Sequence, residues 1–190
     1  LGLCVLGLVA LTTISIEGAI FLMVAHGIAI GGLFLSVGVL YERRQVRLIS
    51  EFGGLTKVVP VFSTFFMIIV FTSAGLPGLA GFVGEFLVIV GTGGSEVLFI
   101  EEASLLIGGK VGPETMAFAF ATVAATGVIF GAVYLLWMFQ RVMFGPLKNP
   151  KNEHVKDLSG REVAYFMPII VVAILMGIFP EALVMNMMHT

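Results

Sequence analysis

The stretch that most constrains this chain is an almost wholly apolar run at residues 57–91, interrupted in its middle by the sequence GLPG. Pro77 has no N–H to donate to a helix, and glycines weaken helical order around it. One carboxylate, Glu85, follows the interruption. A discontinuous helix of this kind exposes backbone dipoles at membrane depth. We therefore predict a functional helix break formed by Gly75, Pro77, Gly78 and Gly81.

The composition indicates a membrane protein. Only 12% of the 190 residues are charged, whereas typical soluble domains have about 25%. The mean hydropathy is +1.09, and the charges are clustered, which leaves long stretches with none. These properties are typical of an all-α polytopic membrane protein.

Five apolar segments are expected to span the membrane within a single transmembrane domain, residues 1–190. A helix needs about 20 apolar residues to cross a hydrocarbon core of about 30 Å. The chain starts inside an apolar run without a basic leader, so we expect it to be a fragment of a longer chain. The predicted spans are 1–12 (truncated), 19–40, 57–91 (broken near 75–81), 115–140 and 163–180.

The basic residues predict how the broken stretch crosses the membrane. If 57–91 crosses once, nine of the ten Lys and Arg lie on one side and only Lys110 lies opposite; if it crosses twice, each side has five. The positive-inside rule favours the single crossing. The same rule gives an orientation in a bacterial inner membrane. Loops 41–56 and 141–162 are then cytoplasmic, and loops 13–18 and 91–114 and the C-terminus face outward.

Glu85 is the one acidic residue well inside a predicted span. Loss of water disfavours its charged form, while the N-terminus of a half-helix starting near residues 79–81 favours it. A carboxyl group balanced between these effects can load and release a proton, so we predict a proton relay. The alternative is a protonated Glu85 that only hydrogen-bonds a neighbouring helix.

His26 is the one histidine inside a predicted span. An imidazole can donate and accept hydrogen bonds and can pass a proton between waters, which makes His26 a second relay candidate. The alternative is a neutral histidine bonded to a carbonyl on a packed helix. Thr122 and Thr126 could hold water, but donation to their own helix is the favoured interpretation. Two GxxxG pairs, Gly27/Gly31 and Gly127/Gly131, predict helix packing.

The sequence contains no motif for metal binding, phosphate binding or redox cofactors. No cluster of His, Asp or Glu has metal-ligand spacing, and Cys4 is the single cysteine. No glycine-rich segment has the spacing of a phosphate loop, and there is no flavin, haem or iron–sulfur motif. We therefore expect no cofactor in this chain, which would conduct or couple protons rather than carry out redox chemistry.

Four motifs carry a resemblance to a known family. They are AHGIAIGGLF at 25–34, LYERRQVR at 40–47, GGL at 53–55 and GLPGLAGFVGEFLV at 75–88. In these motifs the chain resembles the antiporter-like membrane subunits of respiratory complex I. It is most similar to the M type, the counterpart of mitochondrial chain 4. The resemblance covers essentially the whole chain and corresponds to the C-terminal portion of a longer family chain.

The resemblance implies a fold, a function and partners. The fold would be two inverted five-helix repeats, each with one broken helix, and 57–91 would be the broken helix of the second repeat. His26 would be the relay histidine, and Glu85 the ionisable residue of the outward half-channel, where L- and N-type relatives usually have Lys. The function would be proton translocation within an NADH:quinone oxidoreductase, a translocase whose flavin and iron–sulfur clusters lie in partner subunits. The neighbours would be the L- and N-type subunits.

Two departures and two alternatives accompany the resemblance. Val46 replaces a small polar residue of the family, and the 91–114 loop looks longer than usual. One alternative is a subunit of a cation/proton antiporter (Mrp type) or membrane-bound hydrogenase with the same fold. The other is a structural membrane scaffold in which Glu85 and His26 only hold helices together.

Overall fold

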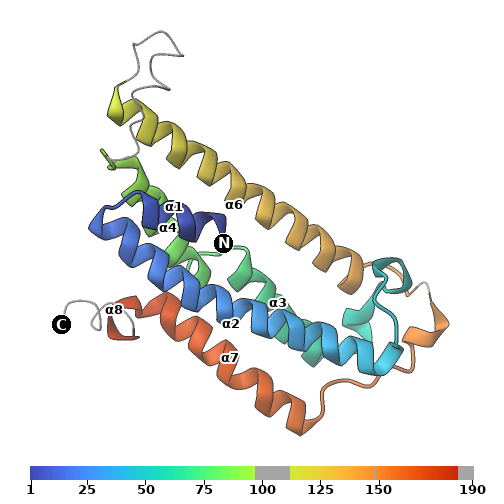
Figure 1. Ribbon diagram of the computed structural model, residues 1–190. Helices are drawn as coiled ribbons and strands as arrows, with labels where there is room; N and C mark the ends of the chain where they lie inside the picture. The colour runs from blue at the N-terminus through green and yellow to red at the C-terminus, as the bar shows by residue number, and fades with distance from the viewer. Residues whose placement is uncertain (97–111, 148, 184–190) are drawn as a thin grey trace.

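The chain forms a bundle of helices, with no strand among the residues described (Figure 1). A computed structural model describes residues 1–96, 112–147 and 149–183. Most of the predicted 91–114 loop, with Glu101, Glu102 and Lys110, lies outside these residues, as does the end of the C-terminus. Short 3-10 turns lie at Ile49–Glu51, Leu55–Lys57 and Pro150–Asn152. The helices are α1 Gly2–Val9, α2 Thr13–Arg44, α3 Pro60–Ser73, α4 Ala80–Gly93, α6 Pro113–Met143, α7 Gly160–Ile178 and α8 Pro180–Leu183.

Three of the described helices, α2, α6 and α7, are long and apolar enough to cross a membrane. The stretch at 57–91 instead forms two helices of 14 residues each, α3 and α4. At 1.5 Å per residue each is about 21 Å long, shorter than a hydrocarbon core of about 30 Å. Figure 1 shows that α4 continues in the direction of α3, without the chain turning back. The helical interruption falls at residues 74–79.

Helix α2 starts earlier than the sequence analysis expected. Thr12 caps it: its Oγ1 accepts a hydrogen bond from the Ser15 N–H at 3.1 Å, and Ser15 Oγ accepts one from the Thr12 N–H at 3.2 Å. This reciprocal capping box satisfies two otherwise free donors of the first turn. The predicted loop at residues 13–18 is therefore wrong, because these residues are the first turns of a 32-residue helix.

Glycines bring α4 against α2. A Cβ built on Gly84 would lie 2.7 Å from Leu22 Cβ, and one built on Gly18 would lie 2.7 Å from Leu87 Cβ. Real Cβ atoms do not approach so closely, so the two backbones can meet only where these side chains are absent. The predicted GxxxG pairs do not act this way between the described helices. A Cβ on Gly27, Gly31 or Gly127 would meet nothing within 4 Å.

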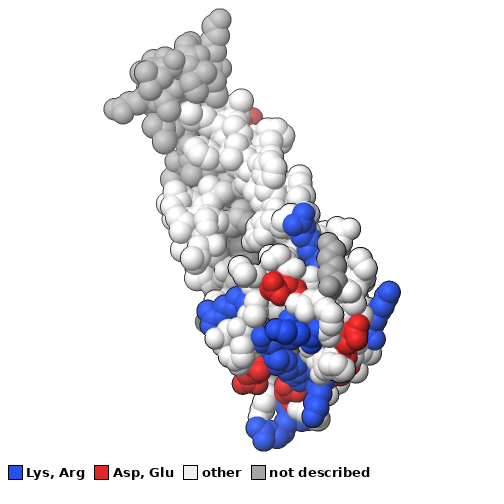
Figure 2. All heavy atoms as spheres, turned by 90° about the vertical axis from the view of Figure 1, so that its right-hand side faces the viewer, with Lys and Arg blue, Asp and Glu red and all other residues white. Residues whose placement is uncertain are grey.

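The charged side chains gather at one end of the molecule (Figure 2). There Arg43, at the end of α2, pairs with Glu162 at 2.8 Å and donates to the Lys156 carbonyl at 2.7 Å. Arg44 donates to Asn152 Oδ1 at 2.7 Å. Both arginines therefore fasten the segment before α7 to the end of α2.

Beneath this charged end lies the largest cluster of buried apolar side chains. Aromatic rings of α3 and α6 pack on one another, with Phe62–Phe66 and Phe66–Phe139 ring centroids 5.6 Å apart. The cluster also holds buried Leu55 and Val59 from the segment that leads into α3. Burial of this many apolar side chains fixes the start of α3 against α6.

Asp157, which is distant in sequence, caps the N-terminus of α3. Its two carboxylate oxygens accept hydrogen bonds from the Val61 and Phe62 N–H groups, each at 2.9 Å. The first N–H groups of a helix have no partner within the helix and carry its positive dipole end. A carboxylate from the segment before α7 therefore serves as the cap that α3 lacks locally.

We expect Asp157→Ala to lower the free energy of unfolding of the full-length protein by about 0.5–2 kcal/mol, the usual cost of losing a helix cap. The measurement is thermal or denaturant unfolding of the purified protein in detergent. Glu153→Ala is the matched control, since Glu153 is an exposed carboxylate of the same segment. Equal stability of the two variants would contradict the capping role.

Candidate functional site

The interruption between α3 and α4 is a well-formed pair of turns. Gly75, with φ +70°, ends α3: its N–H donates to the Thr72 carbonyl at 3.4 Å, and the Leu76 N–H donates to the Phe71 carbonyl at 3.0 Å. This is the Schellman pattern, which requires a left-handed residue such as glycine. The Leu79 N–H then donates to the Leu76 carbonyl at 3.1 Å.

The second turn explains the order of residues in GLPG. Pro77 takes the second position of the turn Leu76–Leu79, and Gly78, with φ +91°, takes the third. Proline followed by a residue of positive φ is the signature of a type II turn. Thus Gly75, Pro77 and Gly78 lie between α3 and α4, whereas Gly81 lies in the first turn of α4.

Neighbouring helices hold the interruption in place. A Cβ on Gly81 would overlap the Thr72 carbonyl oxygen, so the end of α3 and the start of α4 touch. On the other side, a Cβ on Gly177 in the last turn of α7 would lie 2.5 Å from the Leu79 carbonyl carbon. Ala80 is fully buried in one cluster with Phe21 of α2 and Met176 of α7. The first turn of α4 is therefore held by three helices.

Glu85 is half-buried, and its side chain reaches back to the interruption. A Cβ built on Gly75 would overlap Glu85 Oε2 and lie 3.1 Å from its Cδ, so the carboxyl group lies directly against Gly75. Glu85 Oε2 is buried without a hydrogen-bond partner among the described residues. The carboxyl group thus has one oxygen that is not engaged by another described residue and is available to form a hydrogen bond.

Helix α4 sets the position of Glu85 relative to the interruption. Sequence analysis expected the positive end of the second half-helix to favour the carboxylate. The structure starts α4 at Ala80, which puts Glu85 beyond the first turn. The dipole effect fades within that turn, and Oε2 accepts no backbone N–H. Oε2 therefore gains no hydrogen bond from the start of α4, and the effect of the helix dipole on the charge of Glu85 stays a prediction.

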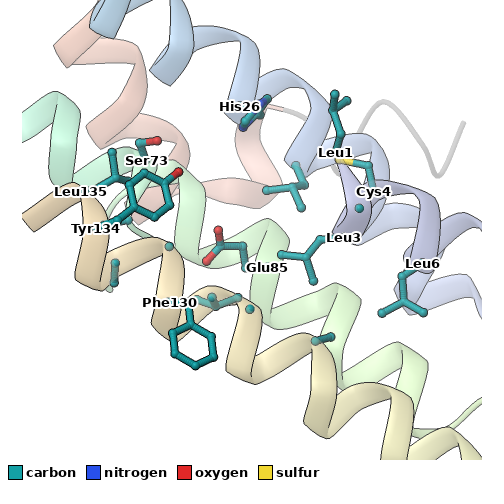
Figure 3. Close-up of a pocket in the computed structure, with 18 of the residues that line it drawn as sticks. Leu1, Leu3, Cys4, Leu6, His26, Ser73, Glu85, Phe130, Tyr134 and Leu135 are labelled. Atoms are coloured by element: carbon teal, nitrogen blue, oxygen red, sulfur yellow. The ribbon is translucent and has the colours of Figure 1, made fainter.

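A cavity of about 630 Å³ lies beside Glu85 (Figure 3). Residues of α1, α2, α4, α6 and the end of α3 line it, and most of its lining is apolar. His26 of α2, half-buried, lines the same cavity, so the structure brings together the two residues that sequence analysis singled out. An apolar chamber with a few polar groups of different helices is the usual form of a functional site.

Two further polar residues of the cavity escaped the sequence analysis. Ser73, the last residue of α3, and Tyr134 of α6 both line it (Figure 3). The position of Ser73 just before GLPG was a signal that could have identified it. Tyr134 gives no such signal, because only the packing of α6 beside α4 brings it to the cavity. Both carry hydroxyls that can donate and accept hydrogen bonds.

Other candidates have structural roles or lie elsewhere. Thr122 Oγ1 donates to the Phe118 carbonyl at 2.8 Å and Thr126 Oγ1 to the Val123 carbonyl at 2.7 Å, which confirms the prediction that they bond to their own helix. Neither threonine lines the cavity. Among the described residues, no three His, Cys, Asp or Glu side chains are grouped as metal ligands would be.

Known proteins align with this chain over nearly its whole length. The chain is 39% identical over 185 residues to the NADH-ubiquinone oxidoreductase chain 4 of Marchantia polymorpha, covering 97% of this chain and 33% of the relative. It is 36% identical over 189 residues to the NADH-quinone oxidoreductase subunit M of Rickettsia typhi, covering 100% of this chain and 34% of the relative. The chain thus spans about a third of the length of these relatives.

Solved structures show the same fold. A chain of respiratory complex I from Thermus thermophilus with bound NADH is 32% identical, with a TM-score of 0.73 over 94% of this chain and 33% of that chain. A chain of the membrane-bound sulfane sulfur reductase, an archaeal respiratory membrane complex, has a TM-score of 0.64 at 23% identity, covering 87% of this chain and 24% of that chain.

The family comparison covers α1 to α4, and so the interruption and the part of the cavity lining that lies outside α6. Residues 1–108 match the family described as "NADH:quinone oxidoreductase/Mrp antiporter, TM". The match includes His26 and Glu85 and more than half of the 190 residues. The chain therefore belongs to this family of NADH:quinone oxidoreductase and Mrp antiporter transmembrane proteins.

Proposed function

We propose that this chain is part of the proton-translocating M-type membrane subunit of an NADH:quinone oxidoreductase. One observation carries the proposal: Glu85 lies against a helix interruption, with one oxygen unpartnered among the described residues, beside a cavity that His26 also lines. Ionisable groups at membrane depth are costly and mark ion and proton pathways. The names of the relatives give the proposal its reaction class.

The free carboxyl oxygen favours transport over a purely structural role. A glutamate that only holds helices together has a partner on the neighbouring helix. Glu85 Oε2 has none among the described residues. In the proposed mechanism Glu85 takes a proton from the cavity, by way of His26, and releases it toward the outward side. Ser73 and Tyr134 supply hydroxyls that hydrogen-bond along the cavity wall.

The proposal includes the topology predicted from the sequence. The two half-helices are each too short to cross alone, at about 21 Å, and α4 continues the direction of α3 (Figure 1). We therefore propose that α3, the interruption and α4 make one crossing. The charged end of the molecule, with loops 41–56 and 141–162, then faces the cytoplasm of a bacterium.

The energy for transport would come from outside this chain. In the proposal, flavin and iron–sulfur clusters lie in partner subunits, and L- and N-type subunits are the membrane neighbours. The second candidate, an Mrp-type cation/proton antiporter subunit, is favoured by the family description alone. Co-purification of the full-length protein with flavin and iron–sulfur subunits separates the two candidates, because an antiporter requires neither.

We expect Glu85→Gln to lower the rate of proton pumping by roughly tenfold or more, since positioned proton-transfer groups contribute about 10²–10⁴-fold. Glutamine keeps the shape and the hydrogen-bonding capacity but carries no titratable proton. Glu85→Asp keeps the carboxyl group and retains part of the activity. The measurement is NADH-driven proton pumping by membrane vesicles that contain the assembled complex.

The control for Glu85 is Glu153→Gln, an exposed carboxyl group before α7. Normal pumping by Glu85→Gln in an assembled complex would contradict the relay. If neither Glu85 variant assembles, the scaffold interpretation is favoured instead.

We expect His26→Gln to slow pumping less than Glu85→Gln, and in a way that depends on pH. Glutamine can hold the same hydrogen bonds but cannot take a proton near neutral pH, as imidazole does. The measurement is the pH profile of pumping in the same vesicles. A profile identical to that of the unsubstituted complex would assign His26 a packing role.

The single crossing predicts the side of the membrane from which introduced cysteines can be labelled. We expect Ser50→Cys and Lys151→Cys in the full-length protein to react with an impermeant maleimide from the cytoplasmic side, and Glu96→Cys from the opposite side. All three positions are exposed. Labelling of Ser50→Cys and Glu96→Cys from the same side would show that the stretch crosses twice.

A further inference from the structure

Among the described residues, two buried side-chain oxygen atoms lack a hydrogen-bond partner, and both belong to α4: Glu85 Oε2 and Thr92 Oγ1. Residues seven apart lie on the same helix face, separated by about 10.5 Å along the axis. Buried polar groups are nearly always bonded, so an exception needs an explanation. Two exceptions on one face of one helix point to a shared cause.

The missing partner of Thr92 is not a general property of threonines in this fold. Buried Thr72 Oγ1 donates to the Ile68 carbonyl of its own helix at 2.8 Å. Hydroxyls near the end of α4 are also satisfied: Thr12 Oγ1 donates to the Gly91 carbonyl at 3.1 Å, and Ser95 Oγ to the Ala10 carbonyl at 2.5 Å. Thr92 is fully buried beside these bonded groups, and its own hydroxyl is free.

Polar side chains also lie beyond Thr92, at the end of α4. A surface cavity of about 580 Å³ lies at the end of α4, lined by Ser95, Glu96 and Glu114 among others. This end of α4 packs on the start of α2, where a Cβ on Gly91 would lie 2.7 Å from Ser15 Cα. It is thus remote from the charged end of α2 that carries Arg43 and Arg44. Glu85, Thr92 and this cavity therefore follow one another along α4 toward the end of the bundle opposite the basic cluster.

We propose that the Thr92 hydroxyl is a hydrogen-bonding station for water on a proton path from Glu85, along α4, to the cavity that holds Glu96 and Glu114. The proposal rests on the proposed function, for which it supplies the outward half of the route. A hydroxyl accepts one hydrogen bond while it donates another, so it holds a water on each side without a change in its own bonds. A separate water bound at each position would give the two free oxygens their hydrogen-bond partners.

The test compares Thr92→Val with Thr92→Ser in the assembled complex that contains the full-length protein. Valine keeps the branched shape and removes the hydroxyl. We expect it to lower the rate of proton pumping roughly fivefold, equivalent to about 1 kcal/mol at 1.36 kcal/mol per tenfold change. Serine keeps the hydroxyl, and we expect pumping close to that of the unsubstituted complex.

Stability provides the second readout. Because valine removes a buried hydroxyl that has no protein partner, we expect the melting temperature of the complex to be unchanged or raised. Lower pumping by Thr92→Val with unchanged stability, together with normal pumping by Thr92→Ser, is the result expected of a hydroxyl that takes part in transport. Ser36→Ala is the matched control, since it removes a buried hydroxyl that donates to its own helix at the Gly32 carbonyl, 2.8 Å away.

The other possible results would overturn either the role of Thr92 or the proposed function as well. Normal pumping by Thr92→Val, beside a loss in Glu85→Gln, overturns the Thr92 station and leaves the proposed function intact. Normal pumping by both variants overturns both. Equal losses in the Val and Ser variants, or a loss of pumping that follows a loss of stability, show a packing role and overturn the station.

Discussion

In the proposed topology the connection between α3 and α4 lies at membrane depth, where a backbone must satisfy its N–H and C=O groups within the protein. Two turns of the connection supply such bonds. The Leu76 N–H bonds back to Phe71, and the Leu79 N–H bonds back to Leu76. Glycines at 81 and 177 then let α3 and α7 close on the connection. These bonds and contacts fix where α4 starts and where Glu85 lies.

Much of this arrangement could be predicted from sequence, because the signals are local. Pro77 and the positive-φ glycines dictate a turn wherever they occur, and apolar runs of sufficient length predict the long helices. The boundaries of α2 were missed because Thr12 and Ser15 form a capping box within an apparent polar loop. The start expected near residues 79–81 agrees with the start of α4 at Ala80, whereas no local signal indicates that the Glu85 side chain reaches back to Gly75.

Tertiary packing accounts for what sequence could not provide. The cavity beside Glu85 exists because α1, α2 and α6 meet there, and it brings in Tyr134, which no motif marks. Close contact of α2 and α4 uses Gly18 and Gly84, whereas the more conspicuous Gly27 and Gly31 meet nothing among the described residues. The free hydroxyl of Thr92 is likewise invisible in sequence, since most threonines in helices bond to their own backbone.

The central claim is that Glu85 changes its protonation state during turnover. Infrared difference spectroscopy of the assembled complex, recorded with and without NADH, tests it most directly through the C=O stretch of a protonated carboxyl group. The account predicts a carboxyl band that appears or disappears on turnover and is absent from the difference spectrum of the Glu85→Gln complex. An identical difference spectrum in both complexes would contradict it.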